Sequence, residues 1–407
     1  MGDGARPRYD QPFDVQPDEI IVGSPHLRPL LAKLTQLGIS FRDVESSREL
    51  GLTRFVLHDS RAAAEAVGAE VRDALGRADR PGPDLDAVLW GLRLLLADDF
   101  SGWRPLMGKN RVVGHVRGVG RVSYGGGTQD PAPCEPPPEP PQRAAGPGRG
   151  VRVGVLDTRL SPQSWLAGGW VAGYSDLVRD TAPPYAHGHA TFVTGLVLAQ
   201  APGAVVEARG VLDEQGGADS WSVAQAIVRL GRSGLDVLNL SFVCYTEDGQ
   251  APMVLSAAMD RLDPDLVVVA AAGNHGDAGS GTGHELATVA AWPAALDDVL
   301  AVGACDETGK RAPFSPAAPW VDVLATGVGL RSTYLARARS GTGSPADFGG
   351  FATWNGTSFS AALVSGVIAA GTEPGRVSAS EALQDLLRDL DGSGVPDEPP
   401  VLLLSGL

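Results

Sequence analysis

The sequence predicts an α/β protein with a mostly parallel sheet, preceded by a small α+β module. Nearly continuous apolar runs such as Val151–Leu156 are typical of parallel strands that helices cover on both faces. A Pro- and Gly-rich span with eight prolines, 125–150, divides the chain, because proline interrupts helices and central strands. The expected organisation is a flexible N-terminus (1–18), a module (19–124), a semi-rigid linker (125–150) and a main domain (151–407).

The module has the alternating pattern of a small folded domain. Strands are expected at Ile20–Val22 and Phe55–Leu57. Leucines at helical spacing predict an amphipathic helix from Leu27 to Leu37 that ends at Gly38. Further helical segments are expected at Arg61–Leu75, which is rich in alanine, and Leu85–Leu96, which is rich in leucine.

In the main domain, polar residues follow two of the apolar runs. Asp157 ends the first run, and Asn274 follows the run 265–273. Functional sites in open α/β sheets are built at the carboxyl ends of strands, so both residues are candidates for a site. The alternative is that Asp157 caps the next turn and Asn274 is an ordinary turn residue.

Two helix starts add a serine and a histidine. Ser358 lies in a polar turn that opens a helix of small residues, where free N–H groups and the helix dipole suit a developing oxyanion. The alternative for Ser358 is a simple N-cap. His189 begins an apolar helix. The pair of His187 and His189 also suggests a metal, but no third His or Cys follows at ligand spacing.

The chain order Asp157, His189, Asn274, Ser358 resembles that of the subtilisin-like (S8) serine peptidase family. His189-Ala-Thr-Phe-Val-Thr-Gly is similar to the family's His-Gly-Thr-His-Val-Ala-Gly motif. Gly356-Thr-Ser-Phe-Ser-Ala-Ala-Leu-Val-Ser-Gly is similar to its Gly-Thr-Ser-Met-Ala-Ser-Pro-His-Val-Ala-Gly motif. The resemblance extends from Val151 to Ala370 and implies a three-layer core with a mostly parallel sheet.

This resemblance also implies roles for the four residues. Ser358 would attack a peptide carbonyl, His189 would act as base and acid, and Asp157 would orient the imidazole. The Asn274 amide would bind the oxyanion. Two segments would contact the substrate: Ser241, Phe242 and Val243 in one, and Ala272 and Gly273 in the other.

His189 and Asn274 favour subtilisins over sedolisins, because sedolisins have carboxylates at these two positions. Some other positions depart from the subtilisin pattern. Val243 replaces a glycine in the strand that should pair with substrate, so we expect a narrower cleft. The other departures remove no group that handles protons or charge: Arg159, Ala190, Phe192 and Ala362.

Composition limits the partners. The formal charge of −15 argues against nucleic acid or anionic membrane surfaces as partners. The family resemblance implies a protein or peptide substrate. Three cysteines and the absence of an apolar secretory signal in the first twenty residues favour a cytoplasmic location. No cofactor or metal is expected, and the spacing of Asp213, Asp219 and Asp306 leaves structural calcium undecided.

Three functions stay open from sequence. The first is a serine endopeptidase. The second is a subtilisin-like acyl transferase or macrocyclase that passes the acyl group to an amine. The third is a non-catalytic protein that grips a peptide strand. The module 19–124 is similar in layout to the prodomains of subtilisin relatives, which would make it an intramolecular partner; an unrelated regulatory or recognition module is the alternative. After the main motifs, a capped helix is expected beyond Ser378, followed by an extended segment near Val401.

Overall fold

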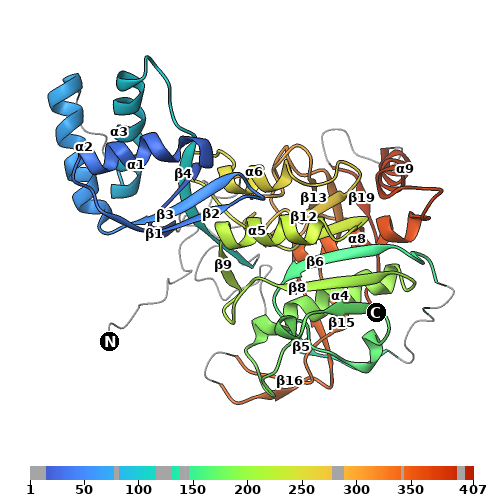
Figure 1. Ribbon diagram of the computed structural model, residues 1–407. Coiled ribbons are helices and arrows are strands. Elements are labelled where there is room, and N and C mark those ends of the chain that lie inside the picture. Colours follow the sequence, from blue (N-terminus) through green and yellow to red (C-terminus); the bar gives the residue numbers. More distant parts are fainter. Residues whose placement is uncertain are drawn as a thin grey trace. The chain divides into compact units, whose positions relative to one another are not determined.

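The computed structural model describes residues 15–77, 82–115, 130–137, 143, 146–276, 288–340, 343–391 and 399–407. They fall into two compact units that are interleaved along the sequence. Unit 1 comprises the chain up to Val112 together with Asp219–Gln225 and Pro252–Arg261. Unit 2 comprises Val113–Ala218, Ala226–Ala251 and Leu262–Leu407. Figure 1 follows their elements along the chain.

Unit 1 combines an antiparallel sheet with helices α1, α2 and α3, and it also includes α6 (Met253–Met259) and the start of α5 (Ser220–Gly231). The strands pair in the order β4-β1-β3-β2. The predicted strands and helices are confirmed, and two strands, β2 and β4, lacked a clear sequence signal. The elements are β1 (Val15–Gly23), α1 (Leu27–Gln36), β2 (Phe41–Ser47), β3 (Leu52–Leu57), α2 (Ser60–Leu75), α3 (Asp84–Asp99) and β4 (Met107–His115).

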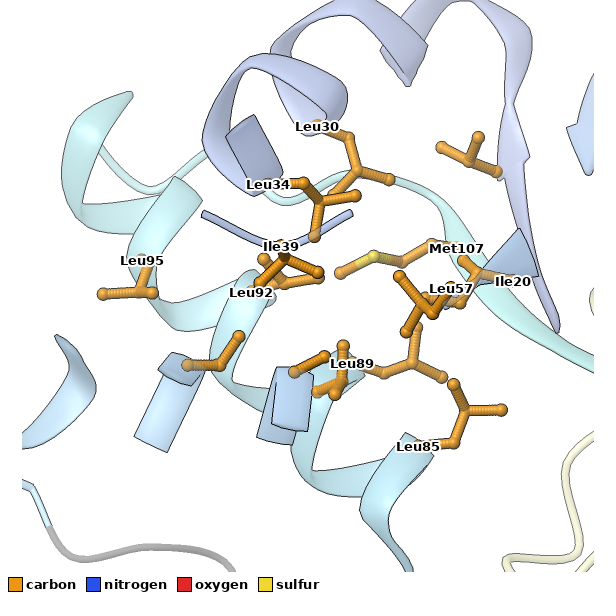
Figure 2. Packing of buried hydrophobic residues seen from close by; sticks show 14 of the residues in the cluster. Ile20, Leu30, Leu34, Ile39, Leu57, Leu85, Leu89, Leu92, Leu95 and Met107 are labelled. Atoms are coloured by element: carbon orange, nitrogen blue, oxygen red, sulfur yellow. The ribbon is translucent and has the colours of Figure 1, made fainter. Parts of the chain in front are cut away.

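The core of unit 1 forms where the helices cover one face of this sheet. Figure 2 shows leucines of α1 and α3 gathered around Ile20, Leu57 and Met107, which come from three different strands. Alternation explains the contribution of the strands, since every second side chain faces the helices. Helix α2 is delimited by Asp59, whose Oδ1 accepts from the N–H of Ala62 at 3.0 Å, and by Gly76 in the left-handed conformation.

A buried asparagine joins β4 to the first turn of helix α5 (Ser220–Gly231) within unit 1. Asn110 is fully buried, and its Oδ1 accepts from Ser220 Oγ at 2.9 Å and from the N–H of Trp221 at 3.0 Å. Its Nδ2 donates to Glu19 at 2.7 Å and to Asp219 at 3.0 Å. Asn110 therefore accepts from one N–H of the first turn of α5, while Asp219 Oδ1 accepts from the next, that of Ser222, at 3.0 Å.

Unit 2 is built on an eight-stranded sheet in which all neighbouring strands are parallel, which confirms the predicted fold class. The strand order is β19-β14-β13-β12-β10-β6-β8-β7. The bounds are β6 (Arg152–Asp157), β7 (Trp170–Ala172), β8 (Val205–Gly210), β10 (Val237–Leu240), β12 (Val267–Ala271), β13 (Leu300–Cys305), β14 (Val323–Thr326) and β19 (Val401–Leu402).

Two helices that pack against each other and against this sheet carry the candidate site. Helix α4 (His189–Gln200) contacts β6 and β8, and α8 (Thr357–Gly371) contacts β10, β12, β13 and β14. Their close approach depends on glycine: a Cβ on Gly366 would lie 2.7 Å from the carbonyl oxygen of Val197. Both helices are buried around most of their circumference, as their apolar sequences require.

Smaller elements complete the two units. Ser378 and Glu381 cap each other at the start of α9 (Ala379–Asp391), and β19 supplies the extended C-terminal segment, so both predictions are confirmed. No helix in the described ranges is long and apolar enough to span a membrane. The remaining elements are β5 (Ala132–Pro133), β9 (Gly217–Asp219), β11 (Phe242–Val243), α6 (Met253–Met259), β15 (Leu330–Thr333), β16 (Arg337–Ala338), β17 (Ala346–Asp347) and β18 (Phe351–Trp354).

Much of the predicted linker, 125–150, lies outside the described residues. Within it, Ala132 and Pro133 form β5 at the edge of a three-stranded sheet with β15 and β18. An edge is where a strand that contains proline is tolerated, because its missing N–H breaks no central ladder.

Candidate functional site

Asp157 and His189 form a buried pair at the carboxyl end of β6. Nδ1 of His189 lies 2.7 Å from Oδ2 and 2.9 Å from Oδ1 of Asp157, and both side chains are almost fully buried. A carboxylate only accepts hydrogen bonds, so Nδ1 of a neutral His189 carries the proton. Nε2, on the other side of the ring, then carries the lone pair that can accept a proton.

Thr158 holds Asp157 in place through hydrogen bonds. Its backbone N–H donates to Asp157 Oδ1 at 2.6 Å, and its hydroxyl also donates to that oxygen at 3.2 Å. The same hydroxyl accepts from the N–H of Ala190 at 3.1 Å, at the start of α4. The strand end and the helix start are therefore connected through one threonine.

Aromatic rings surround the imidazole. The rings of Trp354 and Phe359 lie 5.7 and 5.3 Å from that of His189, measured between centroids. Phe192, which stands where the resembling family has a second histidine, packs against both, at 5.8 Å from Trp354 and 4.4 Å from Phe359. Phe192 therefore replaces a polar ring with an apolar one. Together with Trp354 and Phe359 it forms an aromatic cluster that keeps water from one side of His189.

Ser358 occupies the first turn of α8, next to Phe359. Its Oγ lies 3.4 Å from the carbonyl oxygen of Ser241, and its own carbonyl accepts from Ser241 Oγ at 3.1 Å. Ser241 Oγ in turn accepts from Nδ2 of the buried Asn239 on β10, at 2.8 Å. This chain of hydrogen bonds fixes the start of α8 to the end of a core strand.

The amide of Asn274 is oriented by Thr357. Oδ1 of Asn274 accepts from the N–H of Thr357 at 3.0 Å and from its hydroxyl at 3.1 Å. The Thr357 hydroxyl also accepts from the N–H of Gly273 at 3.1 Å. Because these two donors hold Oδ1, Nδ2 of Asn274 points towards Gly356. A Cβ added to Gly356 would lie 3.3 Å from Nδ2.

The two segments expected to contact substrate lie at the ends of neighbouring strands. Ala272 and Gly273 follow β12, while Phe242 and Val243 form β11 after β10, the strand next to β12. In unit 2 the edge of β11 is already occupied, since Phe242 pairs with His115 and Val243 with Gly114. Strand β9 pairs with β4 as well. A segment of the chain itself therefore lies on the strand that was expected to hold substrate.

A buried histidine supports the loop after Asn274. His275 is 1% exposed; Tyr245 donates its hydroxyl to Nδ1 at 3.0 Å, and Nε2 donates to the carbonyl of Val289 at 2.9 Å. These bonds require the neutral ring, and burial lowers the pKa of His275 to about 4.

We expect His275 to make the protein less stable in acid. Because its folded pKa is depressed, the unfolded chain binds a proton that the folded chain does not between about pH 6.5 and 4. Stability is therefore lost as the pH falls through this window, by about 2.5 kcal/mol between neutrality and pH 4.5. Urea unfolding of wild type and His275→Gln at pH 7.5 and 4.5 measures this. An equal loss in both proteins would contradict it.

His187 lies two residues before His189. It is 6% exposed, neither ring nitrogen has a hydrogen-bond partner, and burial lowers its pKa. Within the described ranges, no group of three or more His, Cys, Asp or Glu side chains could hold a metal ion.

Three residues that sequence reasoning did not single out complete the site. Thr158, Asn239 and Thr357 touch Asp157, Ser241 and Asn274, respectively. Thr158 and Thr357 each lie next to a candidate residue in sequence, and this position is the only sequence signal that could have identified them. Asn239 had a weaker signal, a polar residue inside an apolar strand.

Comparison with known proteins gives one family. A model described as the subtilase family matches residues 148–389. A thermophilic serine proteinase of Bacillus sp. (strain AK1) is 31% identical over 258 residues, 60% of this chain and 58% of that protein. Subtilisin Savinase of Lederbergia lenta is 33% identical over 233 residues, 54% of this chain and 76% of that protein. The chain thus spans little more than half the length of the first relative.

Solved structures agree on the fold. Fervidolysin from Fervidobacterium pennivorans, described as a keratinolytic enzyme related to subtilisin, superposes with a TM-score of 0.61 at 16% identity. The match covers 100% of this chain and 61% of that one. A cold-adapted subtilisin-like serine proteinase gives 0.50 at 22% identity over 69% of this chain and 95% of its own.

Proposed function

Because this chain belongs to the subtilase family, we propose that it is a serine endopeptidase that forms an acyl-enzyme on Ser358. The observation that carries the proposal is the buried pair of His189 and Asp157, whose imidazole lies 5.3 Å from the ring of Phe359, the residue that follows Ser358 in the first turn of α8. This arrangement offers a base, a residue that orients the base, and a hydroxyl at a helix start.

The first chemical step follows from the tautomer of His189. With Nδ1–H donated to Asp157, Nε2 takes the proton of Ser358 as the oxygen attacks the peptide carbonyl. Asp157 stabilises the imidazolium that results. His189 then returns the proton to the leaving amine, and water hydrolyses the ester by the same route.

The oxyanion is stabilised by two donors. Thr357 holds Oδ1 of Asn274, which orients the amide so that Nδ2 can donate to the carbonyl oxygen as it gains charge. The backbone N–H of Ser358, in the first turn of α8, is the second donor, and the dipole of this helix favours the negative charge.

Covalent labelling tests the assignment of Ser358. We expect a fluorophosphonate to add its phosphoryl group to Ser358 Oγ with loss of fluoride, as mass spectrometry of tryptic peptides would show. Only a serine activated by a base reacts rapidly with such a reagent. Label on other serines alone, or none after the protein has been activated as described next, would reject the proposed nucleophile.

We also propose that the N-terminal module restrains the peptidase. Gly114 and His115 pair with β11, the strand expected to hold substrate, and β9 also pairs with β4. Since β-strand pairing is also how peptides bind an exposed sheet edge, this segment competes with substrate for the same edge. Being on the same chain, it does so at a high effective concentration.

Gly114→Pro should relieve this restraint. Proline removes the N–H of residue 114 and fixes φ near −65°, which suits a central strand poorly. We expect fluorophosphonate labelling of Ser358 to become about tenfold faster, an estimate based on the loss of one or two hydrogen bonds of about 1 kcal/mol each. Thermal unfolding of the same variant serves as a control for the fold. An unchanged labelling rate would show that β4 does not limit access.

Acyl transfer to an amine remains the second candidate, because it uses the same acyl-enzyme. Mass spectrometry of products from a peptide with a free N-terminus distinguishes the two: hydrolysis adds one water, whereas cyclisation leaves the mass of the joined segment lower by that water. For the non-catalytic alternative, labelling of Ser358 would be absent.

A further inference from the structure

Two segments of the chain meet the start of α8 where strands β10 and β12 end. The parallel ladder between these strands stops there, and the chain continues as segments 241–245 and 272–275. In the first segment, Ser241 is hydrogen-bonded to Ser358. The second segment carries the amide of Asn274, whose Oδ1 accepts from the first residue of α8. The proposed nucleophile therefore lies where both segments are fixed to the same helix.

The space between these two segments adjoins the carbonyl that Ser358 would attack. The attacked carbon must approach Ser358 Oγ, which lies 3.4 Å from the carbonyl oxygen of Ser241, while its own oxygen must reach Nδ2 of Asn274. The substrate residue that carries this carbonyl is therefore placed over both segments. Its side chain is attached to the neighbouring carbon, so the space between the segments is the one that this side chain can enter.

Tyr245 crosses this space from one segment to the other. Its backbone belongs to segment 241–245, yet its hydroxyl donates to Nδ1 of His275, in the other segment, at 3.0 Å. A Cβ added to Gly273 would lie 3.2 Å from the hydroxyl oxygen of Tyr245 and 2.6 Å from Nδ1 of His275. The phenol ring is buried in this position. It therefore fills much of the space that a substrate side chain would need.

The rings of Tyr245 and His275 are held in place by several contacts. They meet edge to face, with centroids 5.0 Å apart, and the imidazole stacks on Trp320 with an interplanar angle of 10°. Nε2 of His275 donates to the carbonyl of Val289 at 2.9 Å. If a substrate moved Tyr245 aside, the buried Nδ1 of His275 would lose its donor, which is unfavourable. The filled space is therefore a stable property of the site.

We propose that Tyr245 and His275 restrict the residue before the cleaved bond to small side chains, those of glycine, alanine and serine. The proposal rests on the peptidase function proposed above. A large side chain would have to share the space with the phenol ring, and close-packed interiors do not accept such additional volume. Val243 was expected from the sequence to narrow the cleft, but Tyr245 has the larger effect because its side chain reaches across to the other segment.

Tyr245→Ala should open this space. Two p-nitroanilides of one peptide that differ only in the last residue, alanine or phenylalanine, measure the effect. We expect wild type to favour alanine in kcat/KM by about tenfold, and Tyr245→Ala to lower this ratio by about tenfold, the range in which a pocket discriminates by size. Tyr245→Phe is the matched control, since it keeps the ring and should keep the ratio. An unchanged ratio in Tyr245→Ala would overturn the proposal.

A second measurement needs no change at Tyr245, which matters if the alanine variant does not fold. Full-length wild type and Gly114→Pro are incubated with a peptide library, and mass spectrometry identifies the cleaved bonds. We expect glycine, alanine and serine before the cleaved bond about ten times more often than phenylalanine, tyrosine and leucine, corrected for abundance. Equal or greater cleavage after the large residues would overturn the proposal. The absence of cleavage by both proteins would instead reject the peptidase function on which it rests.

Discussion

Ser358→Ala should lower kcat for peptide hydrolysis by about a millionfold, the loss that removal of the nucleophile causes in subtilisin, a relative of this chain. The remaining rate would come from binding and oxyanion stabilisation, which need no nucleophile. The fold should be unaffected, because the Oγ of Ser358 makes only one long hydrogen bond, of 3.4 Å, and the Ser241 hydroxyl bonds to the backbone carbonyl, which alanine retains.

Casein hydrolysis and thermal unfolding measure the two expectations. Ser360→Ala is a matched control in the same helical turn, since its hydroxyl bonds to the carbonyls of Ala325 and Thr326 rather than facing the site. It should hydrolyse casein within a few-fold of the parent rate. If Ser358→Ala cleaves casein as fast as Ser360→Ala, Ser358 is not the nucleophile.

Asp157→Asn should lower kcat about ten-thousandfold at neutral pH. The amide that replaces the carboxylate can present its NH₂ to Nδ1 of His189, which then becomes an acceptor. The ring proton moves to Nε2, where it prevents His189 from taking the proton of Ser358. Oδ1 of the asparagine can still accept from Thr158, so the local fold should persist.

Steady-state kinetics on a peptide p-nitroanilide give the size of this loss. Asp213→Asn, which changes an exposed carboxylate on the β8–β9 turn, should leave kcat unchanged and controls for the loss of one charge. A decrease of less than tenfold in Asp157→Asn would mean that Asp157 does not set the tautomer of His189.

The sequence predicted strands β6, β12 and β19 of the eight-stranded sheet and the candidate residues, because both depend on local patterns. Buried parallel strands need unbroken apolar runs, and polar residues stand where β6 and β12 end, as at Asp157 and Asn274. Helix starts were equally readable at His189 and Ser358. These features require only neighbours in sequence.

Partners distant in sequence could not be predicted. Nothing in the segment around Gly114 indicates that it pairs with β11, more than a hundred residues later, because backbone pairing leaves little mark on side chains. The strand β5 was missed for a related reason: proline composition predicts an extended chain, and whether an edge accepts it depends on a strand formed by residues 351–354. Thr357 was passed over because its role depends on Asn274, 83 residues away.

The hydrogen bonds of Asn110 determine when unit 1 can complete its fold during synthesis of the chain. Its four hydrogen bonds reach Glu19, 91 residues before it, and Ser220 and Trp221, 110 and 111 residues after it, with Asp219 beside them. The N-terminal strands emerge from the ribosome first, but unit 1 also needs segments that end at residue 261. At about 5–20 residues per second, those segments follow residue 112 by roughly 7–30 s. If β4 were buried before then, the Asn110 amide would lack partners among these residues, at a cost of about 1–3 kcal/mol for each unsatisfied group. Long-range contacts of this kind also slow folding. The module therefore completes its fold only once the chain that it accompanies is largely made.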